Sequence, residues 1–139
     1  VIPSSLADKE VALSDLPDLR VVSSMHERKA LMAELSDGFV ALPGGLGTLE
    51  EFFEVLTWTQ LGIHEKPCGL LNTAGYFDTL VDFLDRAVEE RFIKAEHRSM
   101  IMVHEEPLPL LDLFDSYRRP VVDKAEWILS LSNRNTAGL

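Results

Sequence analysis

The sequence predicts an α/β protein built on a doubly wound parallel sheet. Short, continuously apolar segments recur along the chain, as at residues 39–42 and 68–71. Longer segments with helical periodicity separate them, as at residues 48–61. Fully apolar strands that alternate with amphipathic helices are typical of parallel strands joined by right-handed crossovers. We therefore expect a three-layer α/β/α arrangement with helices on both faces of the sheet.

The first predicted elements lie within residues 1–35. Residues 1–3 resemble a strand that is already under way, and residues 19–23 form a short β-branched strand. A helix is predicted over residues 24–35, with Ser24 as its N-cap and Glu27 as its capping-box partner. Gly38 is the residue expected to end this helix in a left-handed conformation.

The later elements continue the alternation of strands and helices. Gly62 is expected to close the helix over residues 48–61, and residues 72–75 are expected to form a turn. The remaining predicted strands are 39–42, 68–71 and 100–103. The remaining predicted helices are 77–91, 108–117 and 121–131.

The length and composition describe one ordinary globular domain. The chain has 139 residues, of which we assign 1–131 to a single Rossmann-like domain and 132–139 to a polar tail expected to fray. A formal charge of −10 disfavours a nucleic-acid or anionic-membrane partner, because phosphate backbones are bound by clustered Lys and Arg. The single cysteine, Cys68, lies in an apolar segment, so we expect it to be buried in a protein of a reducing, cytoplasmic compartment.

The most informative segment is the glycine loop, PGGLGTLEE at residues 43–51, which follows an apolar strand and precedes a helix. Glycines allow positive φ and a close approach of the backbone to a ligand, and the N–H groups of a first helical turn bind anions. A simpler alternative is a tight turn in which Thr48 and Glu51 form a capping box. The spacing matches neither a Walker A loop nor a dinucleotide fingerprint.

The helix over residues 24–35 carries a cation on its apolar stripe. Met25, Met32 and Leu35 recur at helical spacing and are expected to face the sheet, and Arg28 falls on the same stripe. A guanidinium on an inward face needs a carboxylate, a phosphate or a cleft; the alternative is that Arg28 reaches solvent or a structural acid. The four histidines show no metal-ligand spacing, so we expect no metal site.

These segments resemble the LONELY GUY (LOG) family of cytokinin riboside 5′-monophosphate phosphoribohydrolases, whose members are often labelled lysine decarboxylases. The family motif PGGxGTxxE fits residues 43–51 at every fixed position, and MHERK at residues 25–29 is its second motif. Residues 56–64 and 69–72 also resemble family segments, and the likeness covers about residues 1–118.

The resemblance implies a Rossmann-like fold and hydrolysis of the N-glycosidic bond of a purine nucleoside 5′-monophosphate, without a cofactor, by a homodimer. It implies that Arg28 and Glu51 are the catalytic pair, and that Gly45, Gly47 and Thr48 hold the phosphoribosyl part. The other substrate-contacting positions that it implies are Glu10, Met25, Lys29, Gly44, Leu46, Leu49, Glu50 and Thr57.

Two alternatives to the hydrolase differ in class. The first is a nucleotide-binding carrier or sensor without turnover, which would need the glycines more than it needs Glu51. The second is a pyridoxal-phosphate decarboxylase, which no lysine in a recognisable Schiff-base setting supports. Family members also carry a further strand, helix and glycine-rich phosphate loop upstream of the position of Val1. If the chain truly starts at Val1, we expect poor stability and no activity.

Overall fold

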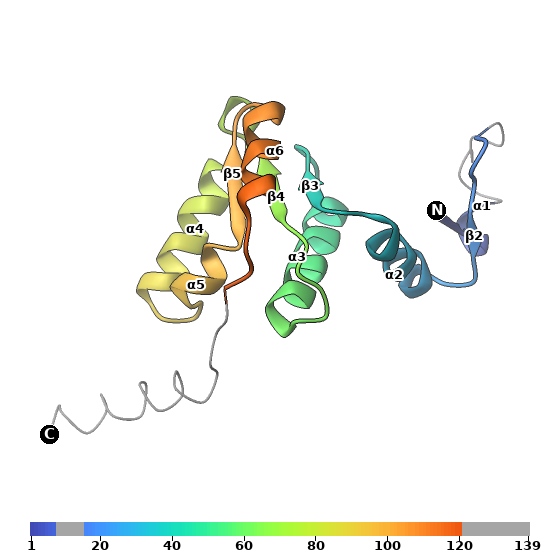
Figure 1. The fold of residues 1–139 in the computed structure, drawn as a ribbon, viewed down its shortest axis with the longest axis horizontal. Helices are drawn as coiled ribbons and strands as arrows, with labels where there is room; N and C mark the ends of the chain where they lie inside the picture. Colours follow the sequence, from blue (N-terminus) through green and yellow to red (C-terminus); the bar gives the residue numbers. More distant parts are fainter. Residues whose placement is uncertain (8–15, 121–139) are drawn as a thin grey trace, which may run out of the picture.

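The computed structural model describes residues 1–7 and 16–120, and parallel strands alternate with helices along them (Figure 1). The predicted α/β class, consistent with a Rossmann-like fold, is confirmed. The strands are β1 (Ile2–Pro3), β2 (Val21–Val22), β3 (Phe39–Ala41), β4 (Cys68–Leu71) and β5 (Ile101–His104). The helices are α1 (Ser4–Ala7), α2 (Met25–Leu35), α3 (Leu46–Leu61), the 3₁₀ turn η1 (Thr73–Gly75), α4 (Asp78–Glu89), α5 (Ala95–Arg98) and α6 (Pro107–Ser116).

The described strands form two parallel sheets rather than one. β1 pairs with β2, and the second sheet has the order β3-β4-β5. In the second sheet Phe39 is opposite Cys68, and Cys68 is opposite Ile101. Figure 1 shows α2 between the β2 end of the molecule and α3, so this helix connects the two sheets. The predicted helix 121–131 and the polar tail 132–139 lie outside the described residues.

The core lies on both faces of β4, the central strand of the larger sheet. Leu70 is fully buried in a cluster that includes Phe52 of α3 and Leu84 of α4. Gly69 faces the opposite side, because successive residues of a strand point to opposite faces. A Cβ at Gly69 would lie 2.9 Å from side-chain atoms of both Leu110 and Phe114. Helices therefore cover both faces of this sheet, as expected for three layers.

The ends of α2 differ from the prediction in two respects. Ser24 is the N-cap, as predicted, and its Oγ accepts the N–H of Glu27 at 3.1 Å. The Glu27 carboxylate returns to the N–H of Ser23 rather than to that of Ser24. The left-handed role predicted for Gly38 is wrong, since the helix ends at Ser36 with an extended backbone. Gly38 instead provides space, because a Cβ there would lie 3.0 Å from Phe114 and Pro67.

The apolar stripe predicted for α2 is only partly correct. Met25 and Leu35 are exposed, and Ala33 is the buried residue of the helix. The reason is that α2 packs against the two-residue strands β1 and β2, which cover less of its surface than a broad sheet would. Gly62 ends α3 at φ 76°, as predicted, and the short helix α5 was not predicted.

Cys68 is a structural core residue, as predicted, with 1% of its surface exposed. Burial raises the pKa of its thiol to about 11. Within the described part of the chain, no helix has the length and apolarity needed to span a membrane.

We predict that iodoacetamide at pH 8 alkylates Cys68 of the folded protein about 100-fold more slowly than Cys68 of the denatured chain, because thiolate is the reactive form. The pKa of the Cys68 thiol is higher in the folded than in the unfolded protein, so the buried, protonated thiol stabilises the fold. This contribution to the free energy of unfolding is fully present below about pH 8.5 and is lost as the pH rises toward the folded pKa. Mass spectrometry measures the rate directly, because the chain has one cysteine. Equal rates in the two states would contradict the burial.

Candidate functional site

The glycine loop lies at the carboxyl end of β3, where ligands bind in open parallel sheets. Gly45 is the N-cap of α3, with an extended backbone and no side-chain hydrogen bond at the cap. Its carbonyl accepts the N–H of Leu49 at 3.2 Å. The loop therefore ends directly in the first turn of a 16-residue helix, whose free N–H groups favour an anion.

The capping-box interpretation of Thr48 and Glu51 is wrong. The helix begins at Leu46, two residues earlier than predicted, so Thr48 lies inside it and is not the N-cap. The Glu51 carboxylate does not return to the helix end. Instead, its Oε1 accepts Nη1 of Arg28 at 2.6 Å.

The three loop glycines are needed for different reasons, and none of them has a positive φ. A Cβ at Gly44 would collide with the Thr48 hydroxyl, so the protein itself requires glycine there. A Cβ at Gly45 or Gly47 would meet no atom within 4 Å. The surrounding residues therefore do not account for Gly45 and Gly47, whereas the close approach of a ligand would account for both.

Arg28 and Glu51 form an ion pair between α2 and α3. The side chains are 26% and 37% exposed, so the pair is partly buried and still reachable from solvent. Arg28 also donates from Nε to the carbonyl of Val1 at 3.2 Å, and its Nη1 lies 3.5 Å from the sulfur of Met25. Val1, Met25 and Glu51 thus hold the guanidinium in place, and the guanidinium orients the Glu51 carboxylate.

Lys29 forms a second ionic contact between the same two helices. Its Nζ lies 2.7 Å from Oε1 of Glu50 and 2.6 Å from Oε2 of Glu54. The hydrogen bonds from Lys29 to Glu50 and Glu54 raise its pKa, so the ammonium stays protonated. Both cations of α2 are therefore engaged by carboxylates of α3, and the site contains one more carboxylate than cation.

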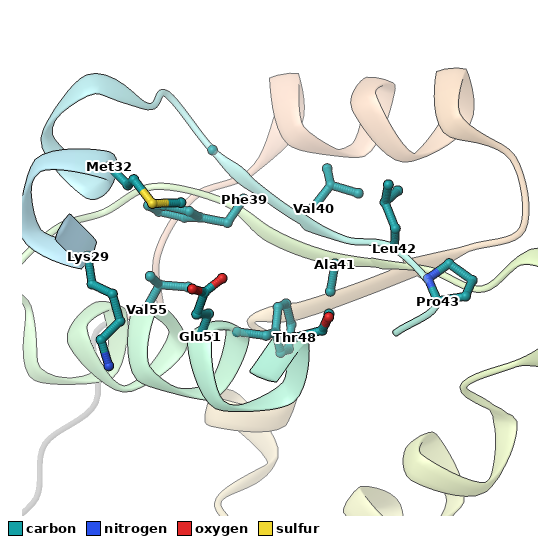
Figure 2. A pocket seen from close by; sticks show the side chains of 12 residues that line it. Lys29, Met32, Phe39, Val40, Ala41, Leu42, Pro43, Thr48, Glu51 and Val55 are labelled. Atoms are coloured by element: carbon teal, nitrogen blue, oxygen red, sulfur yellow. The ribbon is translucent and has the colours of Figure 1, made fainter. Parts of the chain in front are cut away.

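A cavity of about 400 Å³ lies between α2, β3 and α3. Lys29, Met32, Thr48 and Glu51 line it together with the residues of β3. In Figure 2 the Glu51 carboxylate rises from α3 toward β3, with Thr48 one turn earlier on the same helix. Residues 16–120 and 1–7 contain no cluster of His, Cys, Asp and Glu that could hold a metal ion.

The remaining predicted substrate contacts are dispersed. Leu46 is 86% exposed at the start of α3, while Leu49 packs against the core. Thr57 is exposed, and its hydroxyl donates to the carbonyl of Phe53 on its own helix. Glu10 lies outside the described residues.

One contact to the loop was not predicted. The hydroxyl of Tyr76 donates to the carbonyl of Gly44 at 2.7 Å. These residues are 32 positions apart, and no periodicity or motif in the sequence connects them.

The chain is similar to known proteins of one family. The family described as possible lysine decarboxylase matches residues 1–114. A probable cytokinin riboside 5′-monophosphate phosphoribohydrolase of Oryza sativa subsp. japonica is 47% identical over 130 residues, covering 91% of this chain and 53% of the relative. A cytokinin riboside 5′-monophosphate phosphoribohydrolase of Arabidopsis thaliana is 45% identical over 130 residues, covering 91% and 61%. The chain thus spans about half the length of the relatives that it matches.

Proposed function

The chain belongs to the LOG family, within the group described as possible lysine decarboxylases, and from this membership we propose that it hydrolyses a purine nucleoside 5′-monophosphate. The reaction breaks the N-glycosidic bond and releases the free base and ribose 5-phosphate. The observation that carries the proposal is the Arg28–Glu51 ion pair at 2.6 Å beside the glycine loop. One bound nucleotide could contact the ion pair and the glycine loop at the same time.

Glu51 is the proposed catalytic carboxylate. Cleavage of a glycosidic bond develops positive charge on the ribose carbon, and a nearby carboxylate stabilises such an oxocarbenium-like state. Glu51 also orients the ribose hydroxyls or the attacking water. Its contact with Arg28 keeps it placed before the substrate arrives.

Arg28 is the proposed partner of the departing base. A guanidinium stays protonated at any physiological pH, so it supplies positive charge next to the purine as negative charge develops there. Its bonds to Val1 and Glu51 hold the side chain in position.

The loop is the proposed anchor of the 5′-phosphate. Lys29 is already bound by Glu50 and Glu54, so the backbone N–H groups at the start of α3 are the proposed donors to the anion. The open positions at Gly45 and Gly47 let the phosphate approach this backbone. Binding energy from the phosphate then positions the bond to be broken.

Base release tests the proposal. We predict that incubation with AMP and with an N6-prenylated AMP yields free base, separated by chromatography, and that the corresponding nucleosides react at least about 100-fold less efficiently because they lack the anchor. Equal reaction of nucleosides would contradict the anchoring role. Binding of the nucleotides without release of base from either would instead favour a carrier or sensor.

The homodimer that the resemblance implies and the cytoplasmic location that the single cysteine suggests stay predictions. No cofactor or metal takes part in the proposed reaction, and a purine nucleotide is the proposed small-molecule partner. Sedimentation of the purified protein measures the oligomeric state.

A further inference from the structure

We propose that Tyr76 is a positioning residue that holds the peptide group between Gly44 and Gly45 in the orientation needed to bind a phosphate. The inference rests on the proposed function, because it concerns the same loop. It adds a residue that lies outside both sequence motifs and in another part of the chain.

The contact itself is a direct hydrogen bond. Oη of Tyr76 donates to the carbonyl oxygen of Gly44 at 2.7 Å. The ring of Tyr76 lies edge-on to that of Phe77, with centroids 5.0 Å apart and an angle of 87° between the planes. Phe77 is 2% exposed in the core, so it provides a firm base for the ring of Tyr76, which is itself exposed.

The turn that carries Tyr76 is itself fixed. The buried Asn72 accepts the N–H of Phe77 at 2.7 Å and donates to Asp78 at 2.7 Å. Its own N–H donates to the carbonyl of His104 at 2.8 Å, just beyond the paired residues of β4 and β5. Tyr76 therefore reaches the loop from a turn that is hydrogen-bonded to the β3-β4-β5 sheet.

A hydrogen bond to the Gly44 carbonyl also decides where the next N–H points. The peptide group is planar and trans, so the N–H of Gly45 points opposite to the Gly44 carbonyl, away from Tyr76. A peptide between two glycines has little steric preference for one orientation. The hydrogen bond from the Tyr76 hydroxyl favours one orientation of this peptide, which the two glycines alone would not.

The Gly45 N–H is available to a ligand in this orientation. It has no acceptor among the residues that the structure describes, and the space around the missing Cβ of Gly45 is open. If the peptide were reversed, the carbonyl of Gly44 would take the place of this donor and repel an anion. Tyr76 thus keeps the N–H of Gly45, the N-cap, available beside the first turn of α3.

The test is Tyr76→Phe, which removes the hydroxyl and keeps the ring against Phe77. We expect the Kd for AMP to rise about 5- to 10-fold, the Kd for adenosine to change less than twofold, and kcat for AMP to change less than threefold. The preference for the phosphate falls by the same factor as the AMP affinity. General destabilisation would reduce the fraction of folded protein and so weaken the apparent binding of AMP and of adenosine alike. The ratio of the two Kd values therefore separates a positioning role from a structural effect.

Tyr117→Phe is the matched control, because it deletes the other tyrosine hydroxyl of the chain. We expect it to leave both Kd values unchanged. An unchanged ratio of AMP to adenosine affinity in Tyr76→Phe would overturn the inference and leave the hydrolase proposal intact. AMP binding that weakens as expected, without base release from the unmodified protein, would support the positioning role and count against hydrolysis. Failure of the unmodified protein to bind AMP would overturn both.

Discussion

Replacing Glu51 by glutamine is expected to lower kcat for base release by at least about 100-fold while the Kd for the nucleotide changes less than about fivefold. Glutamine keeps the size and one acceptor oxygen, so it can still accept the hydrogen bond of Arg28 that Glu51 accepts at 2.6 Å. It lacks the negative charge that stabilises the developing oxocarbenium ion. The expected loss therefore falls on turnover and not on binding.

The effect of Glu51→Gln on stability should be small. The ion pair is 26% and 37% exposed, and pairs with this much solvent contribute about 0–1 kcal/mol. Glu90→Gln is a matched control, because Glu90 pairs with Arg86 on α4, outside the proposed site. Single-turnover chromatography and calorimetry of both variants measure chemistry and binding separately. If Glu51→Gln turned over like the unmodified protein, the carboxylate would be only a structural partner of Arg28.

Gly47→Ala is expected to change stability and activity in opposite directions. Gly47 lies within α3, its φ is not positive, and a Cβ there would meet no atom within 4 Å. Alanine is the better helix residue, so the free energy of unfolding should rise by about 0.5–1 kcal/mol. The added methyl group occupies the space that the phosphate would enter, so kcat/KM for AMP should fall by roughly 10- to 100-fold.

Urea denaturation and steady-state kinetics of Gly47→Ala measure the two effects. Gly69→Ala is the complementary control, because its Cβ would lie 2.9 Å from Leu110 and Phe114. It should lose about 1–3 kcal/mol of stability and keep its activity per folded molecule. Full activity in Gly47→Ala would show that no ligand approaches this glycine.

The α/β class, the alternation of its elements and the loop motif were predictable from residues that are close in the chain. Apolar runs such as residues 68–71 indicate buried strands, and Ser24 and Gly62 act locally at helix ends, as predicted. The burial of Cys68 followed from its apolar neighbours in the same strand. These features depend on periodicity and on local hydrogen bonds, which the sequence contains directly.

The exact start of α3 was not predictable in the same way. Thr48 and Glu51 match a local capping pattern, but the helix begins at Leu46 and Glu51 pairs with Arg28, which is 23 positions away. Gly38 matches a helix stop, but the close contacts with Phe114 and Pro67 are what favour a glycine there. In both cases a long-range contact replaced the role that the local pattern indicated.

The sequence by itself therefore determined the kind of fold, the family resemblance and the residue types available for chemistry. Only the tertiary structure decided that Arg28 meets Glu51, that Lys29 is bound by Glu50 and Glu54, and that Tyr76 holds the Gly44 carbonyl. The division of the described strands into two sheets was also decided there. The physical reason is that these contacts join segments that come together only when the helices and strands pack, and no local propensity encodes which side chains then meet.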